Sequence, residues 1–285
     1  MLIVGVPSGL ALPDYLSSAA LTGAAVTEFD GVAFDEGAFI PDVPFASYGA
    51  GDGQRVDASD ARLLDRRTSL VSLLSFETAL VPLLGRGLLA TDAAEAATLS
   101  SCFPHDAVCA ATMAQARTSL VWSPSKFHLI GLNTNRAGLV TTTVNERRHR
   151  RLGIHFDSWD SLPMHLRGRS RYRLSVNVGA GDRYFLFMAL TAADILDALK
   201  GEVETASNAT DLLRLVLQRG SHRVYRLRVP PLWGYVAQTD FLPHDGSTFG
   251  AGLADFSTHM LGDFRPLKHY FASSSLIQAG TPPPE

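Results

Sequence analysis

A change in residue pattern near Trp122 most constrains how this chain can fold. Before it, residues 57–120 repeat apolar side chains at the spacing of helices. After it, short runs rich in β-branched and aromatic residues alternate with turn residues, as in KFHLIGLNT, RLGIHFDSW, YRLSVNVG, RYFLFMAL, HRVYRLRVP and WGYVAQTDFL. Many short strands in series indicate an antiparallel barrel or sandwich, with helices from the first half of the chain packed against it.

The order of these segments predicts an α+β protein. We expect residues 1–285 to form a single catalytic domain, with residues 57–120 as a helical support region and residues 126–270 as the β core. Two helices should interrupt that core within residues 191–220. TAADILDALKGEV and NATDLLRLVLQRG each begin with a capping residue and continue with apolar residues at helical spacing.

The composition excludes several classes of protein. It is ordinary for a globular chain, with 46% hydrophobic residues, 19% charged residues and a net charge of -3, so nothing favours nucleic acid as a partner. The first twelve residues lack a basic segment and contain Pro7, which argues against a signal peptide. No apolar stretch reaches the roughly 20 residues of a membrane helix. We therefore expect a cytoplasmic protein that does not bind membranes, while the sequence does not indicate its oligomeric state.

The segment GIHFDSW, residues 153–159, has the clearest chemical signal. In a strand, side chains two residues apart lie on one face, so His155 and Asp157 should project together. One imidazole and one carboxylate on a common face are two of the three ligands in the facial triad of non-haem iron oxygenases. The alternative is a hydrogen-bonded His–Asp pair on a solvated strand face, with no metal.

A facial triad also needs a second histidine from a distant part of the chain. His244 is the preferred candidate because it follows a strand in YVAQTDFLPHDGST. It precedes Asp245-Gly246, a typical turn dipeptide, which predicts a position at a strand end near the mouth of a barrel. The other candidates are His222, His259 and His269.

The order of these motifs resembles the Fe(II)/2-oxoglutarate-dependent oxygenases over residues 126–265. HFD is followed by the Arg-rich strand RYRLSVNVG, by RYFLFM, and by a strand that ends in a histidine and a small-residue turn. The resemblance implies a double-stranded β-helix, or jelly-roll, core with flanking helices. It also implies that His155, Asp157 and His244 are the iron ligands and catalytic residues.

The same resemblance implies a reaction. Fe(II) would be the metal, with 2-oxoglutarate and O2 as co-substrates, and the default outcome is hydroxylation of an unactivated C–H bond. Asp157 argues against halogenation, because related halogenases replace this carboxylate with a small residue. The expected substrate is a small metabolite such as an amino acid or an amino-acid derivative.

The distal carboxylate of 2-oxoglutarate needs a basic partner, and here the chain departs from the family pattern. That partner is commonly an arginine soon after the distal histidine, but no arginine follows His244 before Arg265. A period of two places Arg173, Ser175 and Asn177 on one strand face, which predicts a polar row inside the barrel. We predict Arg173 as the anchor because a guanidinium pairs with a carboxylate through two hydrogen bonds, with Ser175 and Asn177 beside it and Arg265 in reserve. The alternative is an edge strand with solvated arginines.

Two other functions remain open at the level of sequence. One is a cupin-type metal enzyme that does not use 2-oxoglutarate, although such proteins usually contain HxH followed by a glutamate rather than HFD. The other is a metal-free binding barrel in which His155 and Asp157 pair with neighbouring residues.

Overall fold

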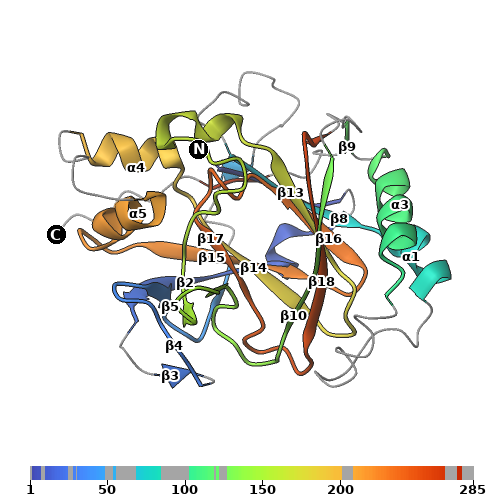
Figure 1. The fold of residues 1–285 in the computed structure, drawn as a ribbon, viewed down its shortest axis with the longest axis horizontal. Helices are drawn as coiled ribbons and strands as arrows, with labels where there is room; N and C mark the ends of the chain where they lie inside the picture. The colour runs from blue at the N-terminus through green and yellow to red at the C-terminus, as the bar shows by residue number, and fades with distance from the viewer. Residues whose placement is uncertain are drawn as a thin grey trace.

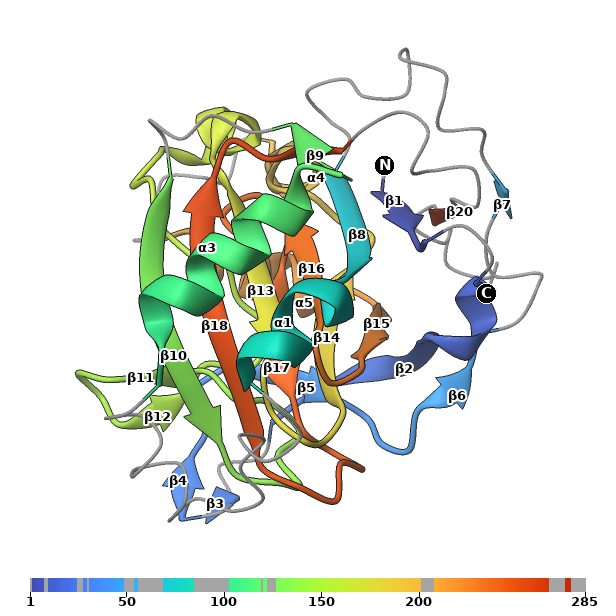
Figure 2. The same cartoon turned by 90° about the vertical axis from the view of Figure 1, so that its right-hand side faces the viewer.

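The computed structural model describes the chain in ranges separated by gaps. They are residues 2–7, 10–24, 28–29, 31–48, 54–55, 69–84, 103–118, 120–121, 127–200, 208–266 and 275–277. Two β-sheets form the body of this described part, and helices lie outside them (Figures 1 and 2).

The larger sheet has eight strands, and its neighbours are antiparallel except for the parallel pair β1 and β8. Its order is β10 (His128–Asn135), β18 (Asp255–Gly262), β13 (Tyr172–Asn177), β16 (Trp233–Ala237), β8 (Ser69–Ser75), β1 (Leu2–Gly5), β20 (Ser275–Ile277) and β7 (Gln54–Arg55).

The smaller sheet is antiparallel. Its order is β17 (His244–Ser247), β14 (Arg183–Met188), β15 (Arg223–Val229), β2 (Leu16–Gly23) and β5 (Phe39–Pro41), and β6 (Ala46–Ser47) also pairs with β2. Three short pairs complete the strands: β3 (Glu28–Phe29) with β4 (Val32–Ala33), β11 (Val144–Asn145) with β12 (Arg150–Arg151), and β9 (Leu120–Val121) with β19 (Arg265–Pro266).

Alternating side chains along the strands divide the apolar residues into an inner and two outer layers. The inner layer joins the two sheets, since Leu73 and Tyr235 of the larger sheet cluster with Phe185, Phe187 and Leu227 of the smaller one. The arrangement is a sandwich of two curled sheets.

Helices cover both outer faces of the sandwich. α1 (Glu77–Leu84) and α3 (His105–Ala116) pack on the larger sheet, as Figure 2 shows. α4 (Ala192–Ala198) and α5 (Ala209–Leu217) pack on the smaller one. Two short 3-10 helices, η1 (Leu12–Asp14) and η4 (Met164–Arg169), lie in connections. No helix in these ranges combines the length and apolar character needed to cross a membrane.

The two helices expected within residues 191–220 are present. Thr191 caps α4 through a reciprocal capping box with Asp194, and Asn208 caps α5 by accepting the backbone N–H of Asp211. Both caps satisfy backbone donors that a helix N-terminus would otherwise leave unpaired. The helices place Ile195 and Leu213 on the outer face of the smaller sheet.

The helical prediction for residues 57–120 is wrong for one segment. Residues Ser69–Ser75 form β8, which pairs with β1 and β16 in the middle of the larger sheet. The sequence SLVSLLS is buried on both faces, and a short apolar run of this kind has no periodicity that separates a strand from a buried helix. α1 and α3 are helical as expected, and residues 57–68 and 85–102 lie outside the described part.

Candidate metal centre

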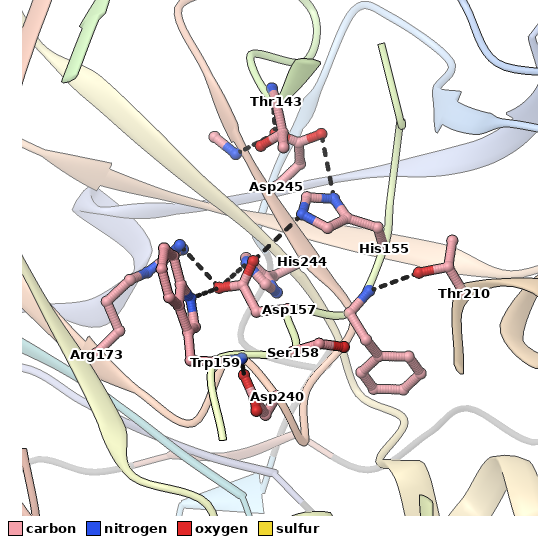
Figure 3. A network of polar contacts seen from close by, with 12 residues as sticks. Thr143, His155, Asp157, Ser158, Trp159, Arg173, Thr210, Asp240, His244 and Asp245 are labelled. Carbon is pink, nitrogen blue, oxygen red and sulfur yellow. Dashed lines mark hydrogen bonds and ion pairs between the residues drawn. The ribbon is translucent and has the colours of Figure 1, made fainter. Parts of the chain in front are cut away.

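The three predicted ligands meet at one place between the sheets. One potential ligand atom from each of His155, Asp157 and His244 lies within 4.8 Å of the other two. The backbones of His155 and His244 form an antiparallel bridge with N–H···O distances of 3.1 and 2.9 Å. This pairing places both rings on one side, with centroids 4.9 Å apart. Figure 3 shows the two rings and the Asp157 carboxylate pointing toward one another.

The segment that contains His155 and Asp157 contacts both edges of the smaller sheet. Ile154 donates its N–H to the carbonyl of Phe39 in β5 at 2.9 Å, while His155 pairs with His244 in β17. Gly153 permits this approach, because its φ is +66° and a Cβ there would lie 2.4 Å from the Phe39 oxygen. The ligand segment is thus held from two sides by backbone hydrogen bonds.

Backbone carbonyls determine which ring nitrogen of each histidine has a lone pair that could bind a metal. Nδ1 of His155 lies 2.8 Å from the carbonyl oxygen of Gly153, and Nδ1 of His244 lies 3.0 Å from that of Leu242. A carbonyl oxygen can only accept, so each Nδ1 has the hydrogen in the neutral ring and each Nε2 has a lone pair. Both Nε2 atoms face Asp157, at 3.6 Å for His155 and 3.3 Å for His244.

The charges in this cluster favour an added cation. Burial opposes protonation of His155, but the carboxylates of Asp157 and Asp245 outweigh it and raise its pKa to about 10. Burial lowers the pKa of His244, and the positive charges of Arg173 and His155 act in the same direction. Burial alone would raise the pKa of Asp157, yet Arg173 and the two histidines hold it well below its usual range. The cluster therefore holds an anionic carboxylate next to a site for positive charge, which a proton or a metal ion can supply.

The donor set fits a divalent transition metal. Ligands on one face of an octahedral ion, with bonds of about 2.1 Å, lie about 3 Å apart, close to the observed N···O separations of 3.6 and 3.3 Å. Two imidazoles and one carboxylate that leave the other positions open are the ligand set of non-haem Fe(II) sites.

Asp245 is a site residue that the sequence reasoning missed. Its Oδ2 lies 3.7 Å from Nδ1 of His155, and the side chain is completely buried. Its Oδ1 accepts the N–H groups of Thr142, Thr143 and Gly246 and the hydroxyl of Thr143. Because Nδ1 of His155 already donates to Gly153 and Oδ2 of Asp245 has no hydrogen-bond partner, Asp245 acts on this ring through its negative charge, which favours positive charge on the imidazole.

The turn predicted at Asp245-Gly246 is wrong. Residues His244–Ser247 form β17, which pairs with β14. Gly246 is needed for close contact rather than for a turn, since a Cβ there would lie 2.4 Å from the hydroxyl of Thr142. An acidic residue directly after a candidate ligand was the sequence signal that could have identified Asp245.

Arg173 lies beside the cluster. β13 runs between β18 and β16, so it is not an edge strand and the solvated-edge alternative is wrong for this residue. One terminal nitrogen of Arg173 donates to Oδ2 of Asp157 at 2.9 Å, and the other donates to the hydroxyl of Tyr235 at 3.1 Å. Its charge therefore already has a partner in the ligand set.

The other predicted co-substrate contacts have different surroundings. The hydroxyl of Ser175 accepts a hydrogen bond from Arg183 at 2.9 Å. The amide of Asn177 donates to the carbonyls of Gly181 and Val229 and accepts the N–H of Gly179, so it holds the β13–β14 connection. Arg265 pairs through its backbone in β19, and its side chain lies outside the described residues.

Arg183 is a buried arginine between the sheets that the sequence reasoning did not select. It begins β14, whose inward residues continue with Phe185 and Phe187. Its Nε lies 3.6 Å from Oδ1 of Asp255, without a hydrogen bond. Period two from Phe185 and Phe187 was the available signal, because it places Arg183 on the inward face.

The remaining candidate histidines do not join the cluster in the described part of the chain. Nε2 of His222 lies 3.2 Å from the carbonyl of Val216. Nε2 of His259, in β18, lies 3.1 Å from the hydroxyl of Ser257, and burial together with Arg183 and Arg173 holds its pKa well below the ordinary value. His269 lies outside the described residues.

Comparisons with known proteins do not assign this chain to a family. No protein-family model and no curated protein matches it. Among solved structures, it is similar to the Kdo hydroxylase KdoO, described as a non-haem Fe(II) alpha-ketoglutarate-dependent dioxygenase. The cobalt(II) complex has 12% identity, covers 75% of this chain and 87% of that chain, and gives a TM-score of 0.39. The apo structure has 12% identity, covers 78% and 88%, and gives 0.38. At these values the likeness supports no conclusion about the chemistry of this chain.

Proposed function

We propose that this chain is a non-haem Fe(II)- and 2-oxoglutarate-dependent oxygenase that hydroxylates an unactivated C–H bond of a small metabolite. The observation that supports the proposal most strongly is the convergence of two Nε2 lone pairs and one carboxylate at a buried position. The proposal includes a double-stranded β-helix as the scaffold and a single catalytic domain over residues 1–285. The substrate class expected from the sequence, an amino acid or its derivative, remains part of it.

The residues around the proposed metal site would have different roles. His155, Asp157 and His244 would hold Fe(II), which when bound supplies the open positions where O2 and the co-substrate react. The carbonyl of Gly153 would hold the His155 ring in position by accepting its Nδ1–H, and the nearby Asp245 carboxylate would favour positive charge at the ring. Because both histidines are buried, the protein would also keep water away from the reacting groups.

The co-substrate anchor is best assigned to Arg183 rather than to Arg173. Both terminal nitrogens of Arg173 already donate to Asp157 and Tyr235. The Arg183 side chain is more deeply buried, with 4% exposed against 13% for Arg173, and its carboxylate neighbour Asp255 is at 3.6 Å without a hydrogen bond. A buried guanidinium that is incompletely paired favours an anionic ligand, and the distal carboxylate of 2-oxoglutarate has that charge. Ser175 bonds to Arg183 and follows Arg173 on the same strand face, so it stays in the proposed site.

Two variants test this assignment. Arg183→Leu should raise the KM for 2-oxoglutarate about 10- to 150-fold, because hydrogen bonds to charged groups contribute about 1.5–3 kcal/mol. Arg173→Leu should mainly weaken Fe(II) binding, because it removes a donor from Asp157. If the KM for 2-oxoglutarate is unchanged in Arg183→Leu but raised in Arg173→Leu, Arg173 is the co-substrate anchor instead.

The function itself is tested on protein purified without air. Metal analysis is followed by an assay for succinate that depends on both Fe(II) and 2-oxoglutarate. Metal binding with succinate formation supports the proposal. Metal binding without succinate supports a cupin-type enzyme instead, and the absence of both supports a metal-free binding barrel.

A further inference from the structure

The two oxygens of Asp157 have different surroundings. Oδ2 accepts the indole N–H of Trp159 at 2.8 Å and a guanidinium N–H of Arg173 at 2.9 Å. Each carboxylate oxygen offers two lone-pair positions, so these donors fill Oδ2. Oδ1 faces Nε2 of His155 at 3.6 Å, and Nε2 of His244 lies 3.3 Å from Oδ2. Asp157 can therefore offer a metal ion Oδ1, whereas Oδ2 becomes available only if one donor leaves.

Trp159 is an unusual donor because its ring is exposed. The residue is 44% exposed, and it is one of four exposed large hydrophobic residues in the described ranges. Its backbone is held in place, since its N–H donates to Oδ1 of the buried Asp240 at 3.0 Å. The next N–H, of Asp160, donates to the other oxygen of Asp240 at 3.0 Å. A fixed backbone restricts the positions that the indole N–H can reach, which favours one hydrogen bond over many.

Exposure increases from the histidines toward the tryptophan. The side chains of His155 and His244 are 3% and 1% exposed, those of Asp157 and Arg173 are 13% exposed, and Trp159 is 44% exposed. The Trp159 side is therefore the least buried side of the cluster. Figure 3 shows the indole of Trp159 and the Arg173 guanidinium on one side of the Asp157 carboxylate and the His155 ring on the other.

We propose that Trp159 is a positioning residue at the entrance of the metal centre. Its N–H restricts Asp157 to binding the ion through one oxygen, which keeps an additional position free for reactants. This inference rests on the proposed metal site. It does not depend on 2-oxoglutarate or on the identity of the substrate.

Two substitutions at Trp159 separate the donor from the ring. Trp159→Phe keeps an aromatic ring and removes the N–H. Trp159→Gln removes the ring but places an amide nitrogen the same number of bonds from Cα. Trp233→Phe is the matched control, because the Trp233 indole donates to a carboxylate oxygen of Glu77 at 3.0 Å, away from the site.

The probe is Co(II), titrated without air into each metal-free protein. Trp159→Phe should weaken Co(II) binding about 10- to 100-fold, the usual effect of losing a group that orients a ligand. Trp159→Gln should recover most of that loss, and Trp233→Phe should match the wild type. The visible absorption of bound Co(II) should change in Trp159→Phe and not in the control, because coordination by a second oxygen alters the ligand field.

Three results would overturn the inference. One is a Co(II) affinity and absorption spectrum in Trp159→Phe that equal those of the wild type. Another is a Trp159→Gln variant that binds more weakly than Trp159→Phe, since the ring and not the N–H would then matter. The third is a wild type that does not bind Co(II), which would remove the proposed function as well. Co(II) binding with the expected variant order but no succinate formation would leave this inference standing while the proposed oxygenase activity fails.

Discussion

Gly153→Ala should destabilise the protein and weaken its metal site together. Residue 153 has φ +66°, a conformation that costs an L-residue about 1–2 kcal/mol. The new Cβ would also lie 2.4 Å from the oxygen, 3.2 Å from the carbon and 3.3 Å from the nitrogen of Phe39. These are backbone atoms of β5 and cannot rotate away, so the two segments must separate.

The separation has a calculable cost. It breaks the 2.9 Å hydrogen bond from Ile154 to Phe39 in a buried region, where an unpaired group costs about 1–3 kcal/mol. Added to the backbone strain, this gives a loss of about 2–5 kcal/mol. For a chain of this size, 1 kcal/mol corresponds to about 2–4 °C in Tm, so the expected decrease is roughly 4–20 °C.

Gly138→Ala is the matched control for this measurement. Gly138 also has a positive φ, +86°, but a Cβ there would meet nothing within 4 Å. It should lose only the backbone term of about 1–2 kcal/mol. Thermal and urea unfolding of both metal-free variants measure the difference, which is attributable to contact with β5.

The metal site provides a second measurement on the same variants. The carbonyl of Gly153 accepts from Nδ1 of His155, so its displacement should weaken Co(II) binding by at least about tenfold, whereas Gly138→Ala should bind normally. A loss of stability in Gly153→Ala no larger than that in Gly138→Ala would contradict the predicted clash with Phe39. If stability falls while Co(II) affinity stays, the carbonyl does not orient the ligand.

Three further predictions concern the ligand set. A metal must displace the proton from His155, because the pKa of this residue is raised to about 10. Co(II) affinity should therefore increase about tenfold per pH unit between pH 6 and 8 and level off above pH 10. Calorimetry in two buffers should count about one proton released per ion, and a pH-independent affinity would contradict this prediction. Asp245→Asn removes one of the two carboxylates that raise the pKa of His155. The pH dependence of Co(II) affinity should therefore become shallower, and fewer protons should be released on binding. An unchanged proton count would exclude the charge interaction between Asp245 and His155. His244→Ala should reduce Co(II) affinity on the order of 100-fold, because a metal-binding free energy of about 10–16 kcal/mol is typically shared among four ligands. His259→Ala should bind Co(II) as the wild type does, and the reverse order would identify His259 as the ligand.

Two arginines in the polar interior of the sandwich differ in how completely their charges are paired. Arg173 and Arg183 both lie between the sheets, and each has a carboxylate neighbour, Asp157 and Asp255 respectively. The Arg173 pair is hydrogen-bonded at 2.9 Å, and the Arg183 pair is not at 3.6 Å. Buried pairs contribute little net stability, and the incomplete pairing of Arg183 agrees with its proposed role as the co-substrate anchor.

Several features followed from the sequence alone because local geometry determines them. His155 and Asp157 project together as alternation predicts, although the strand predicted at residues 151–159 is wrong and only His155 forms an isolated bridge there. The helices at residues 192–198 and 209–217 began at capping residues visible in the sequence. Alternation also put Arg173 and Ser175 on one strand face.

Other features depended on contacts between distant segments. β8 reads as an apolar run, and only its pairing with β1 and β16 makes it a strand rather than a helix. His244 and His259 both lie on inward-facing strand positions, and only the bridge between β17 and His155 decides which of them joins the cluster. The partner of Arg173 and the role of Asp245 likewise depend on contacts between segments far apart in the sequence. Residue spacing encodes the direction of a side chain relative to its own backbone, whereas the register between strands arises from packing the whole sheet and is absent from any local pattern.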